Sequence, residues 1–118
     1  MNAQDVVANL EYVGAAQGRR QTYSIFRGSR HYLVVSFKKD DPRAGNFTIL
    51  SAEAVEYVQS KLGGVKGVTA KRLYEESQRT KHFRDRLVAL NGLYVLVALG
   101  KASVDHRFRT GALVFNLV

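Results

Sequence analysis

The segment from Val68 to Leu117 constrains the fold most, because its residue pattern predicts a fixed order of elements. A short helix is expected at about 70–77, and the turn 78–80 follows it. Apolar residues at helical spacing then predict an amphipathic helix over 81–91. This helix precedes a predicted β-hairpin, so the segment should fold as two helices packed beside a hairpin.

The predicted hairpin has two apolar strands, at 94–99 and at 111–117. Gly92 is expected to end the preceding helix, because glycine readily adopts the left-handed conformation of a helix end. The strands are joined by a long loop at 100–110, and loops of this length on a hairpin are usually functional. The loop carries the charged residues Lys101, Asp105, His106, Arg107 and Arg109.

The helix predicted over 81–91 divides into two faces. Phe83, Leu87 and Leu90 recur at helical spacing and are expected to face the core, with Thr80 as the N-terminal cap. Such a division lets one side of a helix anchor while long polar side chains on the other reach a ligand. The residues expected away from the core are Lys81, His82, Asp85 and Val88, with Arg84 and Arg86 on the flanks.

The first 50 residues are predicted to form a separate α-β-β-β portion. A helix is expected over 3–13, and strands are expected at 20–26, 31–38 and 47–50. The alternation across the central hairpin predicts one shared face for Leu33, Val35, Phe37, Tyr23 and Ile25.

Residues 51–118 are predicted to form the second portion, and both portions are expected to share one unit. Ser51 is placed to cap a helix over 52–62, and Thr69 is placed to cap the helix that follows. Helices and strands that alternate in this order predict an α+β fold class. A chain of 118 residues is long enough to bury a single core.

Composition excludes several kinds of chemistry. The chain has no cysteine, which rules out disulfides, thiolate zinc sites and thiol nucleophiles. Its three histidines lack the spacing of metal ligands, so no metal or other cofactor is expected. No apolar run approaches the ~20 residues of a membrane span, and the acidic N-terminus does not match a signal peptide. A cytoplasmic location is expected, nucleoid-associated if the source is prokaryotic.

The net charge of +8 is concentrated along the chain. Residues 18–39 contain six arginines and lysines and no acid, and residues 69–86 and 101–109 are also rich in basic side chains. Concentrated positive charge is typical of a surface that follows phosphates. The pattern therefore favours a nucleic-acid partner.

The order of elements resembles that of the winged helix-turn-helix superfamily. The resemblance covers about residues 52–117 and is carried by LGGVKGVTAKRLYEES, LVALNGLYVLVAL and GALVFNL. It implies non-catalytic binding of double-stranded DNA, with 81–91 in the major groove and 100–110 as a basic wing. It also implies transcriptional regulation or DNA recognition, often by two-fold dimers. The expected contacts are Gln78, Arg79, Thr80, Lys81, His82, Arg84, Asp85, Lys101, His106, Arg107 and Arg109.

The arginine-rich hairpin in the first 50 residues has two interpretations. Its apolar strands can build an internal sheet or a homodimer contact, and its arginines can add phosphate contacts. We favour a structural role with auxiliary charge. The auxiliary contacts are Arg19, Arg20, Arg27 and Arg30.

Two alternatives remain open. One is a small metal-independent ribonuclease, in which histidine acts as base and cations hold the phosphate. Its residues would be His82, His106, Lys81, Arg107 and Tyr94. The other is a winged helix that binds protein, which the charge disfavours because we expect no exposed apolar cluster.

Overall fold

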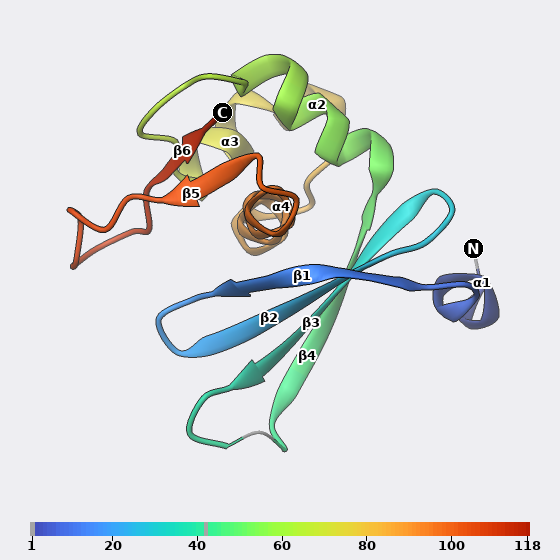
Figure 1. Ribbon diagram of the computed structural model, residues 1–118. Coiled ribbons are helices and arrows are strands. Elements are labelled where there is room, and N and C mark those ends of the chain that lie inside the picture. Colours follow the sequence, from blue (N-terminus) through green and yellow to red (C-terminus); the bar gives the residue numbers. More distant parts are fainter. Residues whose placement is uncertain (1, 42) are drawn as a thin grey trace.

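The computed structural model describes residues 2–41 and 43–118, and it confirms an α+β fold. Within these residues a four-stranded antiparallel sheet forms one layer, and helices with a short hairpin form the other (Figure 1). The elements are α1 Ala3–Val7, β1 Glu11–Gln17, β2 Gln21–Arg27, β3 His31–Lys38, β4 Gly45–Ser51, α2 Ala52–Leu62, α3 Ala70–Glu76, the 3₁₀ helix Gln78–Thr80, α4 Arg86–Ala98, β5 Ala102–Val104 and β6 Phe115–Leu117.

The sheet is a meander in which each strand pairs with the next along the chain, in the order β1-β2-β3-β4. The strands predicted at 20–26, 31–38 and 47–50 are confirmed as β2, β3 and β4, with small changes at their ends. Short turns suffice because all of these pairings are antiparallel.

The helix predicted over 3–13 is wrong beyond Val7. A capping box between Asn2 and Asp5 starts α1, but the helix has only five residues and buries none of them. Asn9 then adopts a left-handed φ of 54°, and the chain enters β1. A helix this short has little stability of its own, whereas β1 pairs with β2 over nearly its whole length, with a register shift between Tyr12 and Gly14.

One predicted feature of the β2–β3 hairpin is wrong, namely the shared face for Leu33, Val35, Phe37, Tyr23 and Ile25. The register pairs Ile25 with Val34, and side chains of paired residues lie on the same face. Leu33, Val35 and Phe37 therefore project from the face opposite to that of Ile25. Because β3 is apolar on both faces, its alternation alone does not identify the side that meets the core.

Helices α2 and α3 follow the prediction. The Ser51 hydroxyl accepts a hydrogen bond from a backbone N–H in the first turn of α2, at 3.1 Å. Thr69 does the same for α3, at 3.2 Å. Both caps satisfy a helix N–H that has no partner within the helix.

The helix predicted over 81–91 does not begin at Lys81, and Thr80 does not cap it. The Thr80 hydroxyl instead donates to the carbonyl three residues earlier, at 2.6 Å. Lys81 then adopts a left-handed φ of 60°, which interrupts the chain between the two helices. Asp85 is the cap of α4, since its carboxylate accepts the backbone N–H three residues ahead at 2.9 Å.

Gly92 does not end this helix, and the strand predicted at 94–99 is wrong. Gly92 lies inside α4, a helix of 13 residues. Residues 94–98 belong to the same helix, and Leu99 is its C-cap. A Cβ at Gly92 would lie 3.0 Å from the Phe83 ring, so glycine leaves room for that ring to pack. A continuous apolar run can be a buried strand or a buried helix, and here it is a helix that is largely buried from Val88 to Leu96.

The C-terminal hairpin consists of β5 and β6, which pair antiparallel. The strand predicted over 111–117 is confirmed only for its last three residues, and the loop between the strands spans 105–114 rather than 100–110. Val68, which lies between α2 and α3, forms an isolated antiparallel bridge with Phe115. The hairpin is thereby joined to the start of α3.

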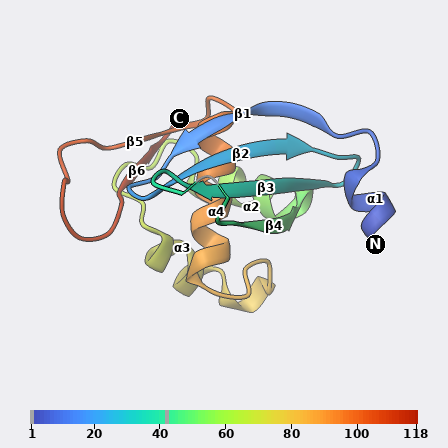
Figure 2. The same cartoon turned by 90° about the horizontal axis from the view of Figure 1, so that it is seen from below.

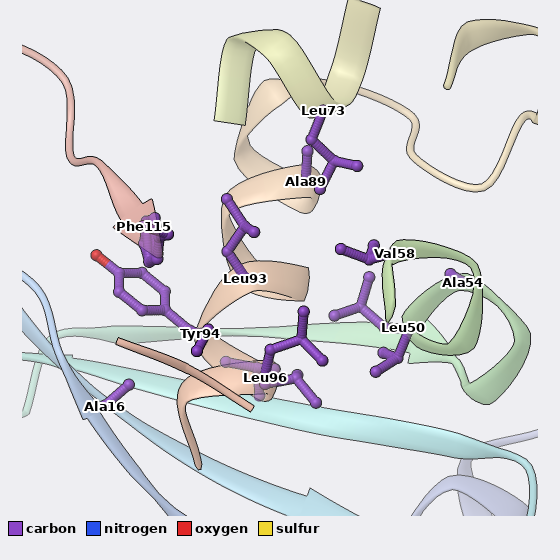
Figure 3. Packing of buried hydrophobic residues seen from close by; sticks show 14 of the residues in the cluster. Ala16, Leu50, Ala54, Val58, Leu73, Ala89, Leu93, Tyr94, Leu96 and Phe115 are labelled. Atoms are coloured by element: carbon purple, nitrogen blue, oxygen red, sulfur yellow. The ribbon is translucent and has the colours of Figure 1, made fainter. Parts of the chain in front are cut away.

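Helix α4 occupies the centre of the molecule, between the sheet and the layer of α2, α3 and the hairpin (Figures 1 and 2). Leu93 and Leu96 are fully buried there, and Leu73 and Phe115 pack around the same helix (Figure 3). Complete burial of such a side chain contributes about 1.5–3 kcal/mol. The two predicted portions therefore share one continuous core.

Candidate nucleic-acid interface

The turn between β1 and β2 carries Arg19 and Arg20, and the preceding Gly18 fixes its position. A Cβ at Gly18 would lie 2.8 Å from Cε2 of Tyr23 and 2.9 Å from the hydroxyl oxygen of Tyr94. The backbone can therefore approach these two rings only because this residue has no side chain. The close approach holds both arginines at the rim of a cleft.

This cleft has a volume of about 430 Å³ and lies between the turn, α3, α4 and the loop before β6. Four of its lining side chains are cationic and none is acidic. Glu75 is the closest acid to one of them, 4.0 Å from Arg86. A concave surface with one sign of charge concentrates the field acting on anions. We name it the basic cleft, and its lining residues are Arg19, Arg20, Gln21, Tyr23, Ala70, Lys71, Arg86, Leu90, Tyr94, Ala112 and Leu113.

Two further hollows adjoin the basic cleft. One, of about 470 Å³, extends along the β5–β6 loop and exposes Phe108 at its edge. The other, of about 560 Å³, reaches the end of β3 and includes a single acid, Asp40. Arg19 lines all three hollows, so they form one continuous surface. We name this surface the basic band, with the side chains Arg19, Arg20, Lys38, Lys39, Lys71, Arg86, His106 and Arg109.

Arg19 also joins the sheet to the hairpin. Its guanidinium donates hydrogen bonds to the carbonyl of Gly111 and, at 3.4 Å, to that of Phe108. Both acceptors lie in the loop between β5 and β6. The loop is therefore held beside the β1–β2 turn, and this contact brings the two halves of the basic band together.

Two stacked tyrosines form the floor of the basic cleft. The rings of Tyr23 and Tyr94 lie 4.2 Å apart at an angle of 25°. Burial raises the pKa of both phenols, that of Tyr94 above the range of an ordinary tyrosine, although Arg19 opposes the shift at Tyr94. Both hydroxyls therefore remain protonated at neutral pH, and they are hydrogen-bonded to each other beneath the cleft.

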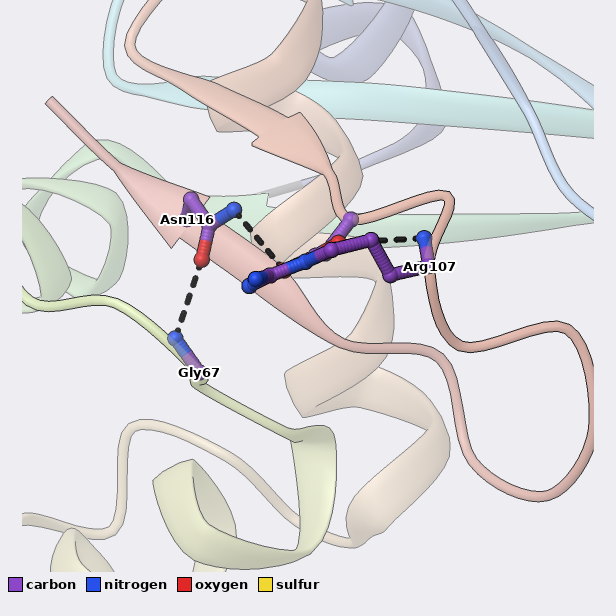
Figure 4. A network of polar contacts seen from close by, with 4 residues as sticks. Gly67, Arg107 and Asn116 are labelled. Carbon is purple, nitrogen blue, oxygen red and sulfur yellow. Dashed lines mark hydrogen bonds and ion pairs between the residues drawn. The ribbon is translucent and has the colours of Figure 1, made fainter.

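Arg107, a predicted contact, is instead bound to a carboxylate of its own loop. Its guanidinium donates to Asp105 through Nε at 3.0 Å and Nη2 at 2.7 Å (Figure 4). Asn116 also donates to Asp105, at 3.2 Å, and accepts the backbone N–H of Gly67. These hydrogen bonds, first of all that from Arg107, hold the pKa of Asp105 well below its usual range. The network orders the base of the loop.

The predicted groove contacts at 78–85 lie beyond the α3 end of the basic cleft. They lie in the 3₁₀ helix Gln78–Thr80 and in the connection to α4, not in an α-helix. The exposed Arg84 side chain pairs with Asp85 at 3.2 Å. His82 packs on Tyr57 of α2, with ring centroids 5.1 Å apart. Gln78, Arg79, Thr80 and Lys81 are exposed.

Three predicted cations lie away from the basic band. Arg27 and Arg30 flank the β2–β3 turn, at the opposite end of the sheet from Arg19. A seven-residue strand separates these ends by about 20 Å. Lys101 precedes β5, at the end of the hairpin opposite to its loop.

The histidines considered for catalysis do not meet. His82 contacts α2, whereas His106 lines the hollow beside Lys39. Tyr94 is stacked in the core, and Arg107 is bound to Asp105. His31 is buried, with Nε2 2.8 Å from the carbonyl of Val6, and so fastens α1 to the sheet. In residues 2–41 and 43–118, no group of three histidines and acids is placed to hold a metal ion.

Sequence reasoning missed four members of the basic band as contacts, namely Lys38, Lys39, Lys71 and Arg86. The first two belong to the acid-free run 18–39, and that signal was sufficient to find them. The other two belong to α3 and α4. Only the packing of these helices against the sheet brings them beside the β1–β2 turn.

Comparisons with known proteins do not assign a family or a function to this chain. No protein-family model, curated protein or solved structure matches this chain. Among the helices in the described part of the chain, none has the length and apolarity needed to cross a membrane.

Proposed function

We propose that this protein is a non-catalytic binder of double-stranded DNA that holds the phosphate backbone along the basic band. The observation that carries this proposal is the convergence of eight basic side chains from distant segments on three adjoining hollows. Cations placed in this way release counterions from DNA and so supply affinity without reading sequence.

A duplex fits this surface better than a single strand does. Proteins that bind single strands stack successive bases on exposed aromatic rings. Among the described residues that line the three hollows, Phe108 is the only exposed aromatic side chain. The basic band therefore presents many positive charges to a phosphate backbone but few aromatic rings on which bases could stack.

The likeness to a winged helix is also part of the proposal. The order α2, bridge at Val68, α3, α4 and hairpin supports it. However, α4 is largely buried from Val88 to Leu96, so only its first turn, at Arg86 and Leu87, is free to reach a duplex. We therefore propose backbone contacts from the band and the β5–β6 loop, with weak sequence preference, in place of groove reading by residues 81–91.

The test is a titration of a labelled random duplex at several salt concentrations, with matched single-stranded DNA and RNA. We expect the duplex to bind best. Affinity should decrease as salt rises, and the magnitude of the slope of log affinity against log salt should decrease by about 0.9 for each phosphate contact removed. The double variant Arg20→Ala/Lys71→Ala should therefore flatten the slope by about 2.

The matched control is Arg27→Ala/Arg30→Ala, which removes the same charge at the other end of the sheet. Its slope should remain that of the wild-type protein. Equal losses in both double variants would contradict the assignment to the basic band. Absence of duplex binding by the wild-type protein, or cleavage of the RNA, would contradict the proposed function itself.

A further inference from the structure

In residues 2–41 and 43–118, α1 is the one element that lies on the second face of the sheet, and most of that face is left uncovered. Helices α2, α3 and α4 and the hairpin all lie on the opposite side (Figures 1 and 2). The register assigns the uncovered side chains, because residues paired with one another share a face. Phe26, Leu33 and Ile49 share it across β2, β3 and β4, and so do Val35 and Phe47. We name this surface the outer face.

The outer face is apolar. Phe47 is 69% exposed, and Phe37 and Ile49 are each 42% exposed. A groove of about 640 Å³ runs between this surface and α1, whose Val6 and Val7 form its far wall. A contiguous apolar patch of this kind is unusual on a monomeric soluble protein. It also corrects the expectation that the chain has no exposed apolar cluster.

The strand positions on the outer face are also uncharged. Fourteen register positions face this way, three each on β1 and β2 and four each on β3 and β4, and none holds an arginine, lysine, aspartate or glutamate. The one histidine among them, His31, is buried against α1. The chain nevertheless carries 18 lysines and arginines. The charged side chain that lines the adjoining groove is Arg43, which is paired with Asp41 at 3.3 Å, so two copies can approach face to face with few like charges opposed. An acidic partner would instead be attracted to the basic band.

The dimensions of the outer face suit a modest dimer. Four strands spaced by about 4.8 Å, each about seven residues long at about 3.3 Å per residue, cover about 440 Å². Two such faces with the adjoining α1 helices approach the ~1,000 Å² of a weak specific interface. Twisted antiparallel sheets also pack face to face, with strands crossed by about 30°.

We propose that two copies of this chain associate through their outer faces in a two-fold symmetric dimer. The identical patch contributes on both sides, as in other isologous contacts. The basic cleft opens on the opposite side of each sheet and remains free in both copies. This proposal does not depend on the proposed function.

The test is the molar mass in solution, measured by sedimentation or light scattering on nucleic-acid-free protein. Between about 1 µM and about 1 mM, the mass should rise from that of the monomer toward that of the dimer. Phe47→Lys places a charge in each half of the contact, and it should raise the dissociation constant at least about tenfold. Phe47 lies on an edge strand and is mostly exposed, so the variant should still fold, as circular dichroism will verify.

The matched control is Leu87→Lys, which makes the same kind of change at an apolar side chain of α4 that is 60% exposed. This variant should dimerise as the wild-type protein does. A wild-type mass that stays monomeric over the whole range would overturn the proposal. So would a folded Phe47→Lys variant that dimerises normally, or equal loss of the dimer in both variants.

Discussion

At the residue scale, Asp105 holds the base of the β5–β6 loop together. Its carboxylate accepts hydrogen bonds from the side chains of Arg107 and Asn116 and from the Arg107 backbone. These donors favour the ionised form, which is why the pKa of Asp105 lies below its ordinary value of 3.8. A group with a lowered pKa stabilises the fold above its ordinary value, and that contribution is lost as the pH falls through the folded-state value.

Asp105→Asn should therefore lower the melting temperature at pH 7, because the amide cannot carry the charge that Arg107 and Asn116 bind. The difference from the wild-type protein should shrink as the pH falls below about 4, because the carboxylate of the unfolded chain then takes up a proton while that of the folded protein stays ionised. Thermal unfolding followed at neutral and acidic pH checks this. Asp40→Asn, in an exposed loop, is the control and should show a small effect at every pH. A pH-independent difference for Asp105→Asn would contradict the role given to its charge.

At the element scale, five residues decide where α4 begins. Lys81 is left-handed and Asp85 caps the helix, whereas the sequence pattern had favoured a helix from Lys81 onward. The pattern failed here because Phe83 is buried as an anchor of the connection, not as part of a helical stripe. Leu87, expected in the core, is mostly exposed, and Val88, expected outside, is buried.

Substitutions on either side of this boundary should have opposite effects. Lys81→Gly should leave the free energy of unfolding unchanged or slightly higher, because it relieves a left-handed residue whose cost is about 1–2 kcal/mol. Asp85→Ala should lower it by about 1 kcal/mol, since the N-cap is lost. Urea unfolding measures both. In a helix that began at Lys81, the glycine would instead cost about 1 kcal/mol, and that result would refute the boundary.

Local sequence patterns predicted the elements whose signals are local. Ser51 and Thr69 marked helix starts correctly, and the alternation in 20–38 marked two strands. The strand predicted at 94–99 failed because α4 is apolar all round, and only its position between two layers explains that pattern. The tertiary environment determined the structure of this segment.

The candidate site was predictable to a similar extent. The acid-free run placed Arg19 and Arg20 among the expected phosphate contacts. Lys71 and Arg86 were not singled out, because their proximity to that turn comes from packing between distant segments. Arg107 is predicted as a wing contact, and the sequence alone does not reveal that its guanidinium pairs with Asp105.

At the scale of the whole molecule, Arg19 links the sheet to the C-terminal hairpin. Arg19 belongs to the β1–β2 turn, and its two acceptors lie 92 and 89 residues later, in the loop between β5 and β6. The basic band exists as one surface only while this loop stays beside the turn. A single side chain thus couples the order of the loop to the shape of the site.

Arg19→Ala should make the loop open more often. The variant loses both hydrogen bonds to the loop, and a loss of at least about 1 kcal/mol would raise the open population at least about fivefold. Tryptic cleavage after Arg107 and Arg109 should accelerate accordingly, as mass spectrometry of a digestion time course would show. Arg20→Ala removes the adjacent charge, and cleavage should then proceed at the wild-type rate. Equal rates in all three proteins would contradict the link.

The burial of α4 has a consequence for the unfolded chain. Its segment from Tyr94 to Leu99, YVLVAL, has no charge, no proline and no glycine, and it is rich in residues that favour strands. Such segments assemble into intermolecular β-structure when they are released from a fold. The native packing keeps this one helical and largely buried. Whatever separates the sheet from α4 therefore exposes an aggregation-prone segment, and concentrated protein held above its melting temperature is expected to aggregate.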